Sequence, residues 1–175
     1  AERKTGTSVG IAIALNIADM QNHAGVGDSS ITADGVSVQA LMKDVSGNKT
    51  HTFAAKATSG ASGGDTGIPG SFALNYSQAE TSATLKTGST VNAGAGDVTI
   101  SAANTTNAQV EAKAKAGGAG DTGVGVSVGL NIAVDNDTRA VIADGATLTG
   151  GKDVTISATG SHVVNTTAEG GGTAK

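Results

Sequence analysis

The stretch GVGVSVGLNIAVDN, residues 123–136, decides the fold. Large apolar residues occupy every second position in it, and small residues occupy most of the positions between them. A period of two is typical of a β-strand, because successive side chains point to opposite faces. The second face is small rather than charged, which indicates that another layer approaches it closely.

The chain contains two further versions of this stretch, GTSVGIAIALNIAD at 6–19 and GIPGSFALNYSQAE at 67–80. The Leu-Asn pairs inside the three copies are separated by 59 and 56 residues. A second element repeats in step, as ADGVSVQA, GDVTISA and KDVTISA. Such fixed-period similarity indicates an array in which each unit buries its apolar surface against the next. We expect one elongated repeat domain over 1–175, with repeats at about 5–64, 65–120 and 121–175, that is a fragment or subunit of a longer array.

The composition favours a thin core and limits the possible partners. Only 2% of the residues are aromatic, 27 are glycine, one is proline and none is cysteine. Disulfides and thiolate metal sites are therefore excluded. The net charge of −4, with its signs interspersed, disfavours nucleic acid as a partner. No apolar run reaches the roughly 18 residues of a membrane helix, so membrane insertion is not expected.

These patterns predict an all-β protein, and two architectures fit them. The first is a parallel β-helix (β-solenoid) with coils of roughly 17–22 residues, so that each repeat holds about three coils. The alternative is stacked antiparallel hairpins or a β-sandwich, which QVEAKAKAGGAGDTGVGVSV at 109–128 invites. Short, evenly spaced strands favour the solenoid, whereas the long alternation at 124–134 favours hairpins.

Several segments resemble a known group of proteins. ADGATLTGGKDVTISATG at 143–160 and NAGAGDVTISAAN at 92–104 are similar to repeats of filamentous-haemagglutinin-type exoproteins and autotransporter passengers. GVGVSVGLNIAVDNDT at 123–138 resembles repeats of giant bacterial surface proteins of the β-strand repeat type. The resemblance implies a right-handed parallel β-helix, secretion to the cell surface, and a role as a stalk or fibre in adhesion or surface coating. The first repeat departs from the pattern, because 18–30 lacks the DNDTRA sequence of 135–140.

Two sets of equivalent residues are predicted to be structural. In-register asparagines can form a ladder of amide hydrogen bonds along a stack, whereas isolated ones would be solvated. The leucines beside them are expected to point inward, so that truncating the third to alanine would cost about 2–5 kcal/mol. The residues are Asn16, Asn75 and Asn131, and Leu15, Leu74 and Leu130.

Candidate cofactor chemistry is sparse. Asp135 and Asp137, with Asp144 nearby, could offer oxygen ligands to Ca²⁺, although the same residues are typical of a turn that caps its own backbone. The other repeats carry SQAE and ADMQ here, so such a calcium site would not recur. His23, His51 and His162 are far apart in the chain and have no repeat partners, which argues against a metal or catalytic role.

We therefore expect a non-enzymatic stalk or fibre segment of a secreted bacterial surface protein, whose partners are neighbouring repeats or copies of itself end to end. One alternative is a self-assembling extracellular filament subunit joined through its β edges. A second is a carbohydrate-binding or carbohydrate-active β-helix acting on host or matrix glycans, although Phe53, Phe72 and Tyr76 are the only aromatic residues. Because the chain stops where another repeat would begin, we also expect the termini at opposite ends of an elongated body.

Overall fold

A computed structural model describes residues 6–62, 64–116 and 122–174. Throughout these residues the regular structure is β, and no helix occurs, which confirms the predicted all-β class. Accordingly, no helix in the described ranges is long and apolar enough to cross a membrane. The strands are β1 (Thr7–Val26), β2 (Ser30–Thr32), β3 (Val36–Ala40), β4 (His51–Ala61), β5 (Thr66–Leu85), β6 (Thr90–Asn92), β7 (Val98–Ala116), β8 (Thr122–Val124), β9 (Val126–Ile142), β10 (Thr147–Thr149), β11 (Val154–Gly170) and β12 (Gly172–Ala174).

The strands form three sheets, and each sheet takes strands from successive thirds of the chain. The first sheet contains β1, β5, β8 and β9, the second contains β2, β6 and β10, and the third contains β3, β4, β7 and β11. All of these pairings are parallel, and β12 adds an antiparallel pairing with β8. Leu15 lies opposite Leu74, and Leu74 lies opposite Leu130.

This register corrects the predicted coil length. Asn16 and Asn75 are paired at a separation of 59 residues, and Asn75 and Asn131 at 56. The chain therefore returns to a neighbouring strand once per repeat, and the expected coils of roughly 17–22 residues are wrong. The physical reason is that short coils need a corner every few residues, whereas β1 and β5 each continue for 20 residues. The corners instead fall at Asp-Gly steps, where Gly35 and Gly145 have φ of 91° and 76°.

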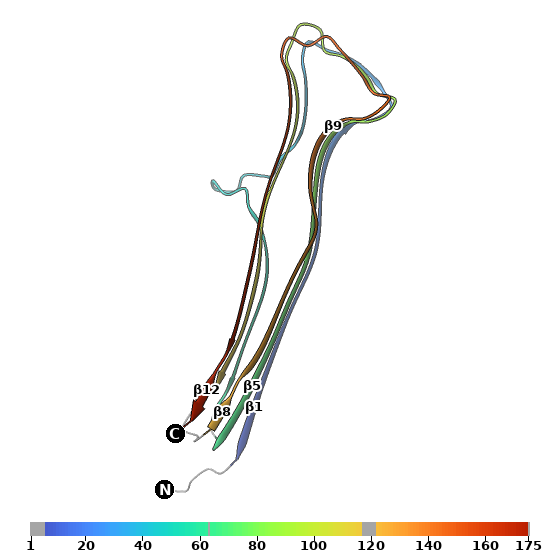
Figure 1. The fold of residues 1–175 in the computed structure, drawn as a ribbon. Coiled ribbons are helices and arrows are strands. Elements are labelled where there is room, and N and C mark those ends of the chain that lie inside the picture. The colour runs from blue at the N-terminus through green and yellow to red at the C-terminus, as the bar shows by residue number, and fades with distance from the viewer. Residues whose placement is uncertain (1–5, 63, 117–121, 175) are drawn as a thin grey trace.

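The antiparallel hairpin alternative also fails for the long strands. The segment 109–128 was the expected hairpin, yet β7 pairs with β3, β4 and β11, whereas β9 pairs with β5. The two long sheets do face each other, as in a sandwich (Figure 1).

The molecule has a triangular head, where the short second sheet joins the two long ones, and a narrow body below it (Figure 1). The head has a core of conventional apolar side chains. Leu85, Val91, Val98 and Ile100 are at most 1% exposed there. This core holds together the three sheets, because strands of each contribute to it.

The body has a core of small side chains. The buried cluster there consists of alanines and one valine, among them Ala73, Val110 and Ala112. A β-carbon placed on Gly10 of β1 would collide with the backbone of Gly60 in β4. The two long sheets are therefore too close for large side chains to fit between them.

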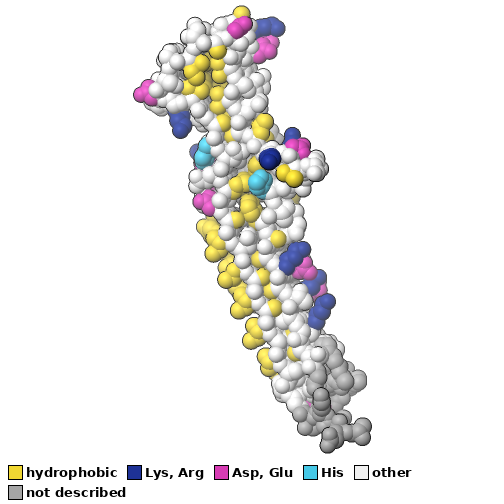
Figure 2. All heavy atoms as spheres, turned by 180° about the vertical axis from the view of Figure 1, so that it is seen from behind, with side chains coloured by type: hydrophobic (Ala, Val, Ile, Leu, Met, Phe, Trp, Pro, Cys, Tyr) yellow, Lys and Arg dark blue, Asp and Glu magenta, His cyan; other side chains and the backbone are white. Residues whose placement is uncertain are grey.

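This close approach overturns the prediction that the leucines point inward. Leu15 and Leu130 are 63% and 44% exposed, and Leu74 is only partly buried. The large apolar side chains of the first sheet project outward along the body instead (Figure 2). The predicted equivalence of the three leucines is confirmed, and the predicted face is wrong.

The beginning of β1 and the last strand, β12, lie at the same end of the molecule, which contradicts the expectation of termini at opposite ends (Figure 1). Ala174 in β12 pairs with Thr122 in β8, Thr122 pairs with Thr66 in β5, and Thr66 pairs with Thr7 in β1. The expectation assumed that the body is long in the stacking direction. Instead it is long in the strand direction, because a 20-residue strand spans about 65 Å whereas three stacked strands span only about 14 Å.

Candidate interaction surfaces

The three equivalent asparagines form the predicted amide ladder. Asn16 Nδ2 donates a hydrogen bond to Asn75 Oδ1 at 2.6 Å, and Asn75 Nδ2 donates to Asn131 Oδ1 at 2.8 Å. Asn75 is completely buried between the sheets. Burying an amide is favourable only when its groups are paired, and the in-register stacking supplies both partners.

The two ends of the ladder differ. Asn131 Nδ2 donates to the carbonyl oxygens of Ala108 and Asn165 at 2.9 and 3.0 Å, which ties the first sheet to the third. Asn16 stands at the opposite end, on β1, and its amide nitrogen is used toward Asn75. The ladder therefore has a direction, with donors pointing from β1 toward β9.

Both end surfaces of the stack consist of strands that pair on one side only within the described residues. At one end these are β1, β2, β3 and β4, and at the other β10, β11 and most of β9. The carbonyls of Gly6, just before β1, and of Val26, at its end, accept hydrogen bonds from Thr66 N at 3.2 Å and Lys86 N at 2.9 Å. Because alternate residues of a strand direct their backbone groups to opposite sides, odd-numbered residues such as Gln21 direct theirs to the open edge. Such an edge is a template for another strand.

Charged side chains alternate in sign across the outer face of the third sheet. Glu111 on β7 lies 3.7 Å from Lys56 on β4 and 2.6 Å from Lys113, and Lys113 lies 3.6 Å from Glu169 on β11. The hydrogen bond and charge of Lys113 lower the pKa of Glu111, and the hydrogen bond of Glu111 raises the pKa of Lys113. The row begins with a cation at one open edge and ends with an anion at the other, so the two edges are complementary in charge.

The outer face of the first sheet is apolar along the body. Its side chains form five rows across three strands, and the rows stop where Asp19 appears on β1. Twelve of the large side chains on it are 40–78% exposed. They are Val9, Ile11, Ile13, Leu15, Ile17, Ile68, Tyr76, Val124, Val126, Val128, Leu130 and Ile132.

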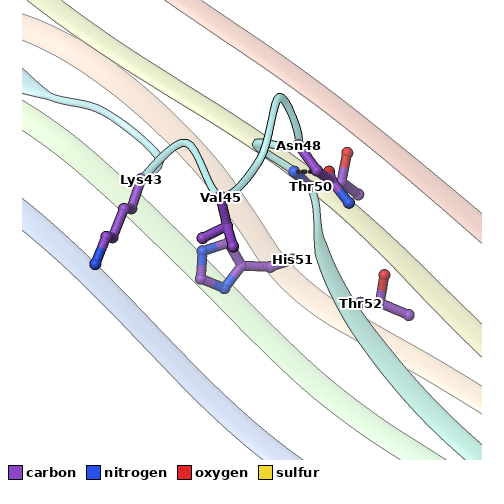
Figure 3. A pocket seen from close by; sticks show the side chains of 6 residues that line it. All are labelled: Lys43, Val45, Asn48, Thr50, His51 and Thr52. Carbon is purple, nitrogen blue, oxygen red and sulfur yellow. Dashed lines mark hydrogen bonds between the residues drawn. The ribbon is translucent and has the colours of Figure 1, made fainter.

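The first third of the chain carries an extra loop, residues 41–50, between β3 and β4. Before the loop, Val36 pairs with Val98, 62 residues later in the chain. After the loop, His51 pairs with Thr106, only 55 residues later. The loop therefore adds seven residues relative to the corresponding part of β7. Its tip is a tight turn at Ser46 and Gly47, whose φ values are 53° and 83°. The turn encloses an open cavity of about 390 Å³, shown in Figure 3, and Lys43, Val45, Asn48, Thr50, His51 and Thr52 line it.

This cavity offers little chemistry. Thr50 N donates to Asn48 Oδ1 at 2.8 Å, which is a local turn contact (Figure 3). Val45 and His51 lie close together on the wall, and the lining contains no carboxylate that could act as a base or hold a metal ion. The arrangement fits a surface loop better than a catalytic pocket.

The calcium candidates do not form a ligand set. Asp137 Oδ2 is paired with Arg139 Nε at 2.8 Å, and Arg139 Nη2 also contacts Glu80 Oε1 at 2.6 Å. Asp135 has a φ of 47° and is the extra residue of a β-bulge in β9, beside the pair Gln78/Ala79 of β5. Asp144 lies beyond the end of β9, and its carbonyl accepts a hydrogen bond from Thr87 Oγ1.

Two of the three histidines lie in one row, which corrects the statement that they lack repeat partners. His51 and His162 pair with Thr106 from its two sides. Thr106 Oγ1 and His162 Nδ1 are 2.8 Å apart. His23 lies elsewhere, on β1, where its Nδ1 is 2.8 Å from Ser82 Oγ.

Sequence reasoning missed both the apolar outer face and the row of alternating charges. The charged row has a recognisable signal, since Lys56 precedes Glu111 by one repeat length and Lys113 precedes Glu169 likewise. The alternation of large apolar residues in β1, β5 and β9 is visible in the sequence, but it predicts that these side chains point to the interior. The small residues of the other face indicate that a layer approaches them, but the alternation does not show whether a layer also covers the apolar face.

Taken together, the open edges and the apolar face are surfaces on which other strands or sheets could pair. Within the part of the chain that the structure describes, no three His, Asp or Glu side chains form a group that could hold a metal ion. Comparisons with protein-family models, with curated proteins and with solved structures find no match for this chain.

Proposed function

We propose that this chain is a segment of parallel β-solenoid with a mechanical role. It stacks with like segments through its open edges to form a stiff fibre, in the stalk or coat of a secreted bacterial surface protein. The observation that carries the proposal is the in-register parallel pairing of β1, β5 and β9, through which the buried asparagine ladder runs without interruption.

The two edges support head-to-tail stacking. The open edge of β1 and the open edge of β9 carry the same pattern of apolar, small and asparagine positions. A neighbouring segment placed on either edge would therefore meet the register that already exists inside the chain. Because the two surfaces differ and their contact does not close into a ring, repetition gives an open fibre.

The charged row supports the same direction of stacking. In the same register, a segment added beyond β11 would place its own Lys56 opposite Thr167 and diagonally beside Glu169, and the alternation of signs would continue. Opposite charges on neighbouring strands add a modest attraction. A head-to-head contact, in which β11 meets the β11 of another copy, would instead bring Glu169 near Glu169. The charges therefore favour head-to-tail over head-to-head stacking.

The proposed fibre has distinctive dimensions. Each repeat forms one layer, so a repeat of 56 residues adds only about 4.8 Å to the length of the stack. The fibre is correspondingly broad, because its width includes strands about 65 Å long. A fibre with about three layers per repeat would be three times as long for the same chain.

The test is the assembly of the isolated chain, followed by sedimentation and electron microscopy at increasing concentration. We expect fibres at least as wide as the long strands, whose diffraction along the fibre axis shows the strand spacing of about 4.8 Å. Gln21→Pro is expected to abolish the fibres, because proline removes a backbone N–H from the open edge of β1. Gln21→Ala keeps that N–H and is the matched control.

A chain that forms no fibres at any concentration contradicts the proposal. Fibres that Gln21→Pro leaves unchanged contradict the assignment of the β1 edge, provided that circular dichroism shows the variant to be folded. Activity of the chain on a polysaccharide would favour a carbohydrate-active β-helix instead.

A further inference from the structure

We propose that the apolar outer face of the first sheet is an interface with the same face of a second copy. This inference does not depend on the edges, since the face lies on the side of the stack and the edges lie at its ends. It concerns lateral pairing, which the proposed fibre does not require.

The exposed apolar area is too large for an ordinary protein surface. A Val, Leu or Ile side chain removes roughly 60–120 Å² from water when it is buried, so twelve side chains that are 40–78% exposed present on the order of 700 Å². The largest apolar patch on a typical monomer is about 300–600 Å², and larger ones mark interaction sites. One side of a standard protein interface buries about 800 Å², which this face nearly supplies.

The arrangement of the side chains suits a second sheet. The five rows lie on hydrogen-bonded parallel strands, so that their tips form a regular surface along one side of the body (Figure 2). Two such faces pack at a spacing of about 10 Å with their side chains interdigitated. Tyr76 and the partly buried Phe72 lie on the central strand, where large anchors contribute most to an interface.

The partner is a second copy rather than a lipid surface. The five rows contain no charged residue, and the first charges along the strands are Asp19 on β1 and Glu80 on β5. A face that binds membranes is typically flanked by lysine and arginine. The described cations on this sheet lie beyond the rows, toward the head: Arg139 is paired with acidic groups, and Lys86 packs against Gly25. An uncharged face is compatible with its own copy, because pairing it by a twofold axis opposes no like charges.

The experiment measures association in the Gln21→Pro background, in which edge stacking is blocked, and in the unaltered chain. Sedimentation equilibrium of Gln21→Pro is expected to show a dimer. Ile13→Lys/Leu130→Lys places two charges on the apolar face, and it is expected to raise the dimer dissociation constant at least tenfold. Thr105→Lys/Gln109→Lys places the same charges on the outer face of the third sheet and is the matched control.

A Gln21→Pro chain that remains monomeric at all concentrations overturns the inference, and so does a dimer that the face substitutions do not weaken. Binding to vesicles of neutral or anionic phospholipid that is lost in Ile13→Lys/Leu130→Lys, without dimerisation, would identify a lipid surface and would also overturn it. Since all four positions are exposed or partly exposed, the variants are expected to fold, and circular dichroism checks this. The fibres of the unaltered chain test the edges independently.

Discussion

Asn75 illustrates how single residues determine this structure. Its neighbours on the inner face of β5 are Ala73 and Ser77, and all three are almost completely buried. A polar residue is tolerated there because Asn16 and Asn131 occupy the same position on the adjacent strands and satisfy its amide. The same closeness of the sheets that selects small inner residues leaves leucine and isoleucine on the outside.

The cost of truncating a leucine is therefore expected to depend on its position. Leu85→Ala should lower the free energy of unfolding by about 2–5 kcal/mol, because Leu85 is fully buried in the head and its removal leaves a cavity. Leu15→Ala, on the exposed face, should cost less than about 1 kcal/mol. Urea unfolding followed by circular dichroism measures both, at concentrations where the chain is not assembled. Equal costs would contradict the assignment of the inner face.

At the scale of the strands, backbone pairing and side-chain pairing reinforce each other. β4, β7 and β11 are hydrogen-bonded in register, and this register brings Lys56, Glu111, Lys113 and Glu169 together. In β9 the bulge at Asp135 changes which residues face inward. As a result Asp137 and Arg139 stay outside, where they pair with each other.

The charged row predicts a pH dependence. The folded pKa of Glu111 lies below its unfolded value, so its contribution to stability is present above the unfolded pKa and is lost as the pH falls through the folded one. The raised pKa of Lys113 contributes below the unfolded lysine pKa, and this contribution is lost only as the pH rises through the folded value. Glu111→Gln should therefore lower the melting temperature at pH 7, and the difference from the unaltered chain should shrink in acid.

The control for this measurement is Asp153→Asn, which removes a highly exposed and looser ion pair with Lys152. It should change the melting temperature little at any pH. A difference for Glu111→Gln that is constant between pH 7 and acid would show that the substitution acts through packing and not through charge.

At the scale of the whole molecule, the head and the body are built from different kinds of core. Leucine, isoleucine and valine fill the head, whereas alanine dominates the body. Burying a larger apolar area stabilises the head more per residue. The beginning of β1 and the last strand, β12, also lie at the far end of the body (Figure 1). The body is therefore expected to open locally before the head does.

Hydrogen exchange can test this order of opening. Amides of β7 at 98–102, in the head, should exchange at least roughly tenfold more slowly than amides of the same strand at 110–114. Both segments belong to one strand that has neighbours on both sides, so the comparison isolates the core. Uniform protection along β7 would mean that the molecule opens as a single unit.

The sequence by itself determined the all-β class, the equivalence of the three Leu-Asn pairs and the asparagine ladder. The all-β class follows from local alternation, and the other two follow from residues that recur at a fixed spacing. Both kinds of pattern are visible along the chain. The small residues between the large ones also indicated that another layer approaches their face, and the close contact of Gly10 with Gly60 confirms this. Only the tertiary structure decided that no layer covers the opposite face, so that the valines, isoleucines and leucines of the body stay exposed. It also decided that one repeat makes one layer, because strand length depends on where the chain can turn. The row that joins Lys56 to Glu169 likewise exists only because the register sets strands from distant parts of the chain side by side.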